Sequence, residues 1–480
     1  MTRGLTSVAV TAAPFLTALD VASILDTAAR AIDATTMVIA VTDREGNVLG
    51  VFRKPNAPST VSGNFGATVD ANDQAVALAR TGAFFSNNQA PLSSRTVRFI
   101  STIHFPAGIT NTPNAALYGI ENTNRGCDLN ATFLPGQQIT PSRSINAING
   151  LPCNSADQRG CGLGIATGKA DVFDSNQAAV NPGGVPIFKE GILVGGGRRD
   201  RGFAGLGGVR GVHRERAERE VRPRGAGARR DLPRRDPASV RQPDDPSRRR
   251  GSGDATGTYF VRPIDSPLGA AGVPAGWLVG PLASPDLSAD DVTTIVNQAV
   301  NIANQARAAI RLPLGSKTRM MIAVSDLHGK LLGLFRMADA TIFSIDVSVA
   351  KARNVVFFSG LSRLPSDLPG VPMGTAVTSR TISFGAQPLF PPGIDASSPG
   401  PFFQLFLNDV ATACRQESAA ERQSERHRVF PGSVPLFKNG QMVGGLGVSG
   451  DGVEQDDLVT AGSDWLRASA RHPRRPRRDR

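Results

Sequence analysis

Two stretches of this sequence nearly repeat one another, and this repeat limits the fold more than any other feature. Residues 40–53 read AVTDREGNVLGVFR, and residues 323–336 read AVSDLHGKLLGLFR. Each is an apolar run, an Asp-x-x-Gly segment and a second apolar run, the pattern of a β-hairpin whose turn glycine takes a positive φ. The sequence therefore predicts a duplicated domain.

The repeat extends on both sides of this hairpin. Before it, Thr17 and Ser288 each precede an apolar stripe of helical spacing, and their hydroxyls are predicted to cap those helices. After it come a second helix, a Ser-Arg-Thr segment and a second hairpin containing Val-Pro-x-Phe-Lys. The matched segments are 77–86 with 350–359, 94–99 with 379–384, and 185–191 with 434–440.

The formal net charge of +12 is unevenly distributed along the chain. Residues 197–250 hold 17 Arg and 8 acidic residues, and residues 471–480 hold 6 Arg and one Asp, so the rest is close to neutral. These segments, and a shorter one at 415–428, lack apolar periodicity and are predicted to be disordered. The abrupt change after Gly196 is typical of out-of-frame translation of a GC-rich gene. A genuine disordered linker is the alternative, and we do not expect nucleic acid as a partner.

A Pro-, Asn- and Gly-rich insertion occupies residues 100–183 and holds Cys127, Cys153 and Cys161, while Cys414 lies in the second half. The cysteine spacings differ from those of a zinc ribbon. A Cys153–Cys161 disulfide and unpaired or differently paired thiols both remain open, and a disulfide would favour an extracytoplasmic protein. We find no convincing signal peptide and no apolar run of the roughly 20 residues that a membrane helix needs.

The order of these motifs resembles the GlcG/HbpS-like haem-binding (haem-degrading) domain family, which includes the carboxy-terminal domain of some PduO-type proteins. The resemblance rests on the Asp-x-x-Gly hairpin, the Val-Ala-Lys-Ala-Arg helix, the Val-Pro-Leu-Phe hairpin and residues 444–456. It implies an α+β fold, a two-layer sandwich of antiparallel sheet packed by helices. Two copies in one chain would form an intrachain pseudo-dimer, and a homo-oligomer is the alternative.

The extent of the resemblance sets the predicted domains. The first spans residues 16–196, carries the long insertion and lacks the final strand and helix. A disordered Arg-rich linker follows at 197–257. The second, complete domain spans residues 285–466, and a disordered tail covers 467–480.

The resemblance implies haem as a cofactor, which requires an apolar slot, an axial ligand and cations for the propionates. The candidate ligands are His328, in the hairpin turn where the first copy has Glu45, and His104, before a Pro-rich segment. Each is also explained as an ordinary turn or loop histidine. Further candidates are Met337, Met373, Tyr118, His213, His427 and His472.

Cations flank the repeated hairpin, where they would form a rim for carboxylates. They are Arg53 and Arg336 at its end, and Lys351 and Arg353 on the next helix. Asp346 and Lys351 match the family's Ser-Ile-Asp-x-x-x-x-Lys pattern. Structural salt bridges are the alternative. The first copy has Leu78 in place of Lys351, so equivalent activity of the two copies is not expected.

The glycine-rich segment 444–452 precedes a helix and would suit an anion, although a tight strand-to-helix turn also explains it. The sequence shows no Ser-His-Asp set, recurring carboxylate pair or metal cluster, so the residues do not support an enzyme. We therefore favour a protein that binds haem or another tetrapyrrole, for storage, sensing or degradation. An enzyme of small organic acids and a non-catalytic oligomerisation module are the alternatives.

Overall fold

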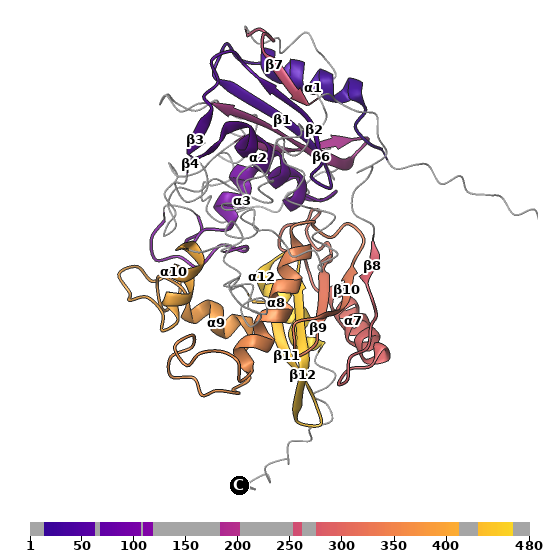
Figure 1. The fold of residues 1–480 in the computed structure, drawn as a ribbon, viewed down its shortest axis with the longest axis vertical. Coiled ribbons are helices and arrows are strands. Elements are labelled where there is room, and N and C mark those ends of the chain that lie inside the picture. The colour runs from indigo at the N-terminus through magenta and orange to yellow at the C-terminus, as the bar shows by residue number, and fades with distance from the viewer. Residues whose placement is uncertain are drawn as a thin grey trace, which may run out of the picture.

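The computed structural model describes residues 14–62, 68–106, 109–118, 183–201, 253–261, 275–411 and 431–463. Its elements fall into two halves, which Figure 1 shows one above the other. Each half contains a five-stranded antiparallel sheet, and a small two-stranded sheet is also present. Within the described ranges, no helix is long and apolar enough to cross a membrane.

The elements of the two halves correspond. The amino-terminal half contains α1 (Ala18–Arg30), β1 (Met37–Asp43), β2 (Val48–Arg53), β3 (Thr60–Ser62), β4 (Thr68–Asp70), α2 (Ala71–Phe85), α3 (Ser94–Ile100), β5 (Gly184–Lys189), β6 (Ile192–Arg201) and β7 (Thr258–Val261). The carboxy-terminal half contains β8 (Gly276–Val279), α7 (Ala289–Ala303), β9 (Met321–Ser325), β10 (Leu331–Arg336), α8 (Ser344–Ser359), α9 (Ser379–Gly385), α10 (Phe403–Ala411), β11 (Ser433–Lys438), β12 (Gln441–Ser449) and α12 (Val453–Gly462). The strand orders are β5-β6-β1-β2-β7 and β11-β12-β9-β10-β8, so the two sheets have the same arrangement.

The predicted antiparallel sheet packed by helices is confirmed, and helices cover both of its faces. In β1, Met37 and Ile39 pack with α1, whereas Val38 and Ala40 pack with α2. Successive strand residues point to opposite faces, so a strand covered on both sides reads as one continuous apolar run. This explains why all seven residues of β1 are buried.

The predicted helix caps are confirmed in both halves. Thr17 and Ser288 each accept a bond from the backbone N–H three residues later, and each belongs to a capping box. The acidic residue of each box also binds the lysine that ends the first strand of the second hairpin of its half. The Nζ–Oδ2 distances are 2.7 Å for Lys189–Asp20 and 2.8 Å for Lys438–Asp291. The same contact therefore joins helix and hairpin in both halves.

The repeated Asp-x-x-Gly segments form the predicted hairpin turns. Gly46 and Gly329 adopt φ values of 85° and 74°, the region that favours glycine. Each turn is also tied to the following helix, because Arg80 Nε donates to Gly46 O and Arg353 Nε donates to Gly329 O, both at 2.8 Å. These arginines hold the hairpin against the helix.

The repeated Val-Gly-Gly segments let a helix approach the sheet closely. A Cβ on Gly196 would lie 1.9 Å from Ala79 O of α2, and one on Gly445 would lie 2.1 Å from Ala352 O of α8. Real Cβ atoms do not approach a backbone oxygen so closely, so any side chain would force the helix away from the sheet. Glycine is therefore required at both positions by helix packing.

Two predicted boundaries are corrected by the strands. Strand β6 continues to Arg201 and pairs with β1 as far as Met37, so the first sheet keeps its final strand and the linker does not begin at 197. Ladder bonds use only the main chain, which explains why an arginine-rich sequence still forms a strand. The second sheet includes β8, so that unit begins before residue 285.

The helix–sheet contact at Gly445 gives a stability prediction. Gly445→Ala should lower the free energy of unfolding by about 3 kcal/mol or more, because the new methyl would meet the backbone of α8. Gly440→Ala is the control, since a Cβ there meets nothing within 4 Å and only its φ of 80° opposes a side chain, at a cost of about 1–2 kcal/mol. Urea unfolding followed by circular dichroism measures both; equal losses would contradict the packing argument.

Candidate functional site

A fully buried lysine–aspartate pair lies in the carboxy-terminal half. Lys351 of α8 has no exposed surface, and its Nζ donates to Val448 O and to Asp456 Oδ2, both at 2.8 Å. Asp456 lies in the first turn of α12. Gly432 leaves the space for this pair, because a Cβ there would lie 2.9 Å from Nζ. The pair thus joins α8, β12 and α12.

Burial shifts the pKa values of both partners toward their neutral forms. Loss of water raises the pKa of Asp456 to about 7, against the opposing effect of Lys351, and lowers the pKa of Lys351. A carboxyl that titrates near neutrality is the type of group that transfers protons in active sites. Here both side chains are almost completely inaccessible, so the geometry supports a structural ion pair sensitive to pH.

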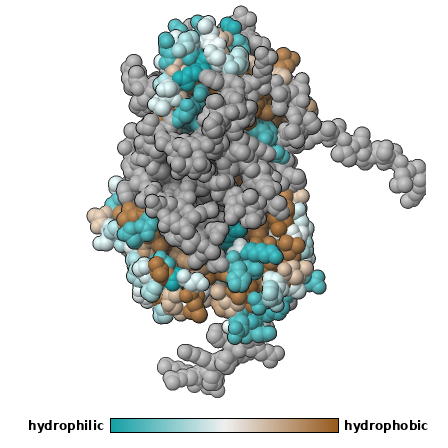
Figure 2. Space-filling view, viewed as in Figure 1, coloured by the Kyte–Doolittle hydropathy of each residue, from teal (hydrophilic) through white to brown (hydrophobic). Residues whose placement is uncertain are grey.

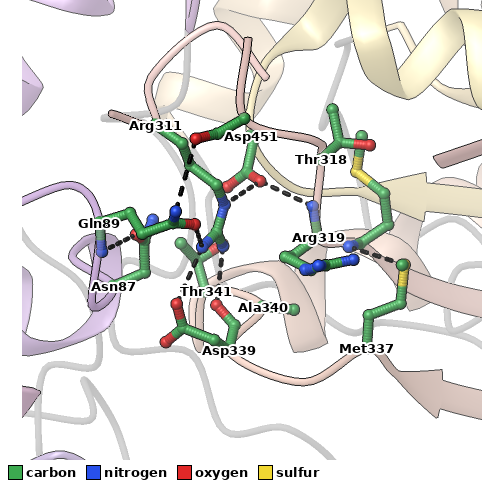
Figure 3. Close-up of polar contacts among 12 residues, drawn as sticks. Asn87, Gln89, Arg311, Thr318, Arg319, Met337, Asp339, Ala340, Thr341 and Asp451 are labelled. Atoms are coloured by element: carbon green, nitrogen blue, oxygen red, sulfur yellow. Dashed lines mark hydrogen bonds and ion pairs between the residues drawn. The ribbon is translucent and has the colours of Figure 1, made fainter. Parts of the chain in front are cut away.

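A second buried cluster, the junction cluster, lies where the two halves meet, and Figure 3 shows its members Arg311, Asp339 and Asp451. It consists of Arg311, Asp339, Asp451 and Arg44. Arg311 Nη1 lies 2.8 Å from Asp339 Oδ2, and Arg311 Nε donates to Asp451. Arg44 from the amino-terminal half reaches Asp339 Oδ1 at 2.9 Å. Asp339 therefore binds one arginine from each half.

Backbone and amide groups of the amino-terminal half complete this junction. Asn88 N lies 3.3 and 3.2 Å from the two carboxylate oxygens of Asp339, and Leu312 N donates to Gln89 O at 3.2 Å. Close by, the rings of Phe85 and Phe343 stack with centroids 4.3 Å apart. The halves are thus joined by both charged and apolar contacts.

The cations predicted to form the rim make contacts within the fold. Arg336 is buried and donates to Ala340 O at 2.6 Å, and Arg53 donates to Ala57 O, the equivalent carbonyl four residues on. Burial, reinforced by nearby Arg44 and Arg311, lowers the pKa of Arg336 to about 9 despite Asp339. These contacts fix the loop after each hairpin.

The other predicted cations and their acidic partner are also placed. Lys351 lies in the buried pair, and Arg353 is half-buried against the hairpin turn. Asp346 lies in α8, and its side chain is outside the described part of the structure. In the glycine-rich segment, residues 444–449 belong to β12, and residues 450–452 lead into α12. The carboxylates of Glu454 and Asp456 occupy the anion-favouring first turn of that helix.

The candidate haem ligands are far from equivalent. His104 is buried, with Nδ1 3.1 Å from Thr112 O and Nε2 2.8 Å from Asp395 Oδ1, so both ring nitrogens are occupied. Met337 is buried and its sulfur accepts a bond from Met320 N at 3.4 Å. His328 lies in the hairpin turn with an exposed side chain. Tyr118 and Met373 are half-buried in loops.

Several predictions fall on residues that the structure does not describe. These are His213, His427, His472 and the four cysteines Cys127, Cys153, Cys161 and Cys414. Among the residues that are described, no three His, Cys, Asp or Glu side chains converge in an arrangement suited to a metal ion.

Sequence reasoning missed the partners of the buried cations. Asp456, Asp451, Asp339 and Arg311 were not identified, because the contacts that define them span up to 295 residues. One signal was present: Lys351 interrupts the apolar run Val349-Ala350-x-Ala352, and an ammonium buried there requires an acidic partner. The local sequence pattern does not indicate which aspartate this partner is.

The family match concerns the same half as the buried pair. Residues 287–463 match the family model described as haem degrading protein HbpS-like. Two solved structures are similar to part of the chain. The crystal structure of a PduOC:Heme complex has 20% identity and a TM-score of 0.23, covering 37% of this chain and 91% of that chain. Klebsiella pneumoniae protein ORFY also has 20% identity and a TM-score of 0.23, covering 36% and 83%. No curated protein matches the chain.

Among the described residues of the matched half, His328 offers an exposed imidazole of the kind that ligates haem iron. Haem iron takes an imidazole, thiolate, thioether or phenolate ligand. Of the described histidines, only His328 presents an exposed ring, and Leu327 and Leu331 on either side are half-buried. Lys330 beside it is exposed and suits a propionate. Figure 2 shows hydrophobic residues among hydrophilic ones over the described surface of this half.

The raised pKa of Asp456 gives a pH prediction. Between about pH 4 and 7 the folded protein keeps a proton on this carboxyl that the unfolded chain releases, so its contribution to stability falls as pH rises. The free energy of unfolding of the wild type relative to Asp456→Asn should therefore fall between pH 5 and 7, by at most about 1.4 kcal/mol per unit. Urea unfolding at a series of pH values measures the difference.

Asp291→Asn is a control for which the change of stability with pH should have the opposite sign. Partial burial opposes ionisation of Asp291, but the bonds from Lys438 and Ser288 lower its pKa overall, so its contribution is complete above about pH 5 and is lost at lower pH. For Asp456, the free energy of unfolding of the wild type relative to Asp456→Asn could instead rise with pH. That result would show that the buried carboxyl is ionised and would contradict the prediction.

Proposed function

We propose that the carboxy-terminal half binds haem or a closely related tetrapyrrole. The observation that supports this most directly is the match of residues 287–463 to the HbpS-like haem-degrading family. The motif resemblance over the same residues agrees with it. When bound, haem would supply a redox-active iron. The protein's own residues would hold it at the turn between β9 and β10, with His328 at the iron and Lys330 at a propionate.

The turn itself is well suited to present an imidazole. Asp326 Oδ1 accepts bonds from His328 N at 2.8 Å and Lys330 N at 2.9 Å, which fixes the turn backbone. Arg353 holds the same turn from α8 through Gly329 O. A rigid turn places the ring with little loss of entropy on binding. The cations required by the organic-acid hypothesis, Arg336 and Lys351, are buried and already bonded.

We also infer that the amino-terminal half is a second copy of the same domain. This is supported by the identical strand orders and by the equivalent contacts of Arg80 and Arg353, Lys189 and Lys438, and Gly196 and Gly445. The copies differ at the proposed site, where Glu45 replaces His328. A carboxylate turn without the imidazole would not ligate haem iron in the same way, so we expect one haem per chain.

Titration of the full-length protein with haem tests the proposal. A shifted Soret band with a stoichiometry of one haem per chain is expected, and His328→Ala should weaken binding about tenfold or more because the iron loses its protein ligand. Glu45→Ala, at the equivalent turn, is the matched control and should bind as the wild type does. Unchanged affinity in His328→Ala would reject this ligand, and absence of a Soret shift in the wild type would reject haem binding.

A gain-of-function variant tests the asymmetry between the halves. Glu45→His places an imidazole at the turn of the amino-terminal half, where Asp43 and Arg80 hold the backbone as Asp326 and Arg353 do in the other half. The expected result is a second, weaker haem equivalent in the absorbance titration. A stoichiometry that stays at one would show that the turn alone does not make the site.

A further inference from the structure

Two partly exposed apolar side chains lie at the end of the carboxy-terminal sheet that carries the turn between β9 and β10. Strands β12 and β9 are antiparallel, with Gly445 opposite Ser325. Met442 lies three residues before Gly445 and His328 lies three residues after Ser325, so both lie at the same end of the sheet. Phe437 of β11 is the cross-strand partner of Met442, and both side chains are half-buried. The turn therefore has apolar neighbours on the adjacent strands.

Helix α8 runs toward the same end of the sheet, which it covers in Figure 1. Ser325 Oγ donates to Ala352 O at 3.2 Å, so these two residues lie side by side. Arg353 Nε donates to Gly329 O in the turn. Phe357 lies one helical turn beyond Arg353 on the same face of the helix, and its side chain is half-buried. The helix thus brings an aromatic side chain close to the turn.

The chain just after α8 supplies the most exposed residue of this group. Leu361 is 78% exposed. The preceding Gly360 lies against β12, because a Cβ added there would be 3.8 Å from Met442 Cε. The loop that holds Leu361 is well fixed, since buried Arg363 donates to the backbone carbonyl oxygens of residues 358, 364, 371 and 372. The leucine is therefore exposed on an ordered loop.

These apolar side chains together form one surface, which we call the tip surface: Phe357, Leu361, Phe437 and Met442. We propose that the haem ring lies on the tip surface when His328 ligates its iron, an inference that rests on the proposed function. Contiguous apolar side chains on an ordered surface are typical of a binding site. A porphyrin ring is a large apolar plane, so contact with such a surface supplies the hydrophobic part of its affinity. Exposed Lys330 is the nearby cation for a propionate.

The amino-terminal half uses the equivalent surface for another contact. The residues at the positions of Phe357, Leu361 and Met442 are Phe84, Asn88 and Leu193. Phe84 and Leu193 are fully buried. Phe84 O accepts bonds from Ile342 N at 3.1 Å and Phe343 N at 3.4 Å, and Asn88 N donates to Asp339. The carboxy-terminal half therefore covers this surface, in agreement with one haem per chain.

Haem titration of the full-length protein tests the tip surface. Leu361→Asn introduces the residue that the other half has at this position. It should weaken haem binding about tenfold, because an exposed leucine no longer packs on the ring, while the shape of the Soret band stays that of the wild type because His328 still ligates the iron. Leu282→Asn is the matched control. Leu282 is 43% exposed and its N donates to Leu332 O, which places it beside β10 on the other side of the same hairpin.

The outcomes separate this inference from the proposed function. Weaker binding in His328→Ala together with unchanged affinity in Leu361→Asn would reject the tip surface and leave the iron ligand in place. Weaker binding in Leu282→Asn alone would place the ring on the other side of the hairpin. A lower molar mass of haem-free Leu361→Asn in light scattering, with unchanged haem affinity, would assign the surface to contacts between chains. Absence of a Soret shift in the wild type would reject both proposals.

A measurement on the wild type alone does not depend on how the variants fold. Zinc protoporphyrin IX is diamagnetic, so its ring current shifts the NMR signals of methyl groups that lie over its face. In protein with ¹³C-labelled leucine and methionine methyls, the signals of Leu361 and Met442 should shift most on binding, and those of Leu282 should stay in place. Shifts confined to Leu282 would overturn the proposal.

Discussion

Asp339 connects the two halves of this protein, because its carboxylate binds Arg311 from one half and Arg44 from the other. Burying these charges costs several kcal/mol for each ion unless every one is paired, so the junction favours a single relative placement of the halves. Arg311 in turn binds Asp451 at the end of β12, which connects the junction to the strand and helix that hold the lysine–aspartate pair. These ion pairs thus lie in one region that extends from the junction to α12.

Both halves contain the same three kinds of stabilising contact. A glycine pair brings the helix onto the sheet, an arginine ties the helix to the hairpin turn, and a lysine ties the second hairpin to the capping box. These contacts need only a close approach or one well-placed charge, so they survive in two sequences that differ elsewhere. Where the halves diverge, at Leu78 and Lys351 and at Glu45 and His328, the difference concerns charge and ligand chemistry.

This divergence indicates that the two halves have different roles. The half that matches the haem-degrading family has the buried titrating pair and the exposed turn imidazole, whereas the other half supplies Arg44, Gln89 and His104 to the contacts between them. Arg44 meets Asp339 and His104 meets Asp395, so both sets of contacts end on an aspartate of the carboxy-terminal half.

The sequence by itself determined the hairpins, the capped helices and the similar order of these elements in the two halves, because those depend on local patterns of period 2 and 3.6 and on turn glycines. It also showed that Lys351 and Leu78 break the repeat. Only the tertiary structure decided that the cations of the expected rim are buried, that β6 runs on to Arg201, and that His104 faces Asp395. Those facts depend on which distant residues meet. A local sequence pattern does not determine where the backbone hydrogen bonds of a strand end, nor which residue pairs with a buried charge.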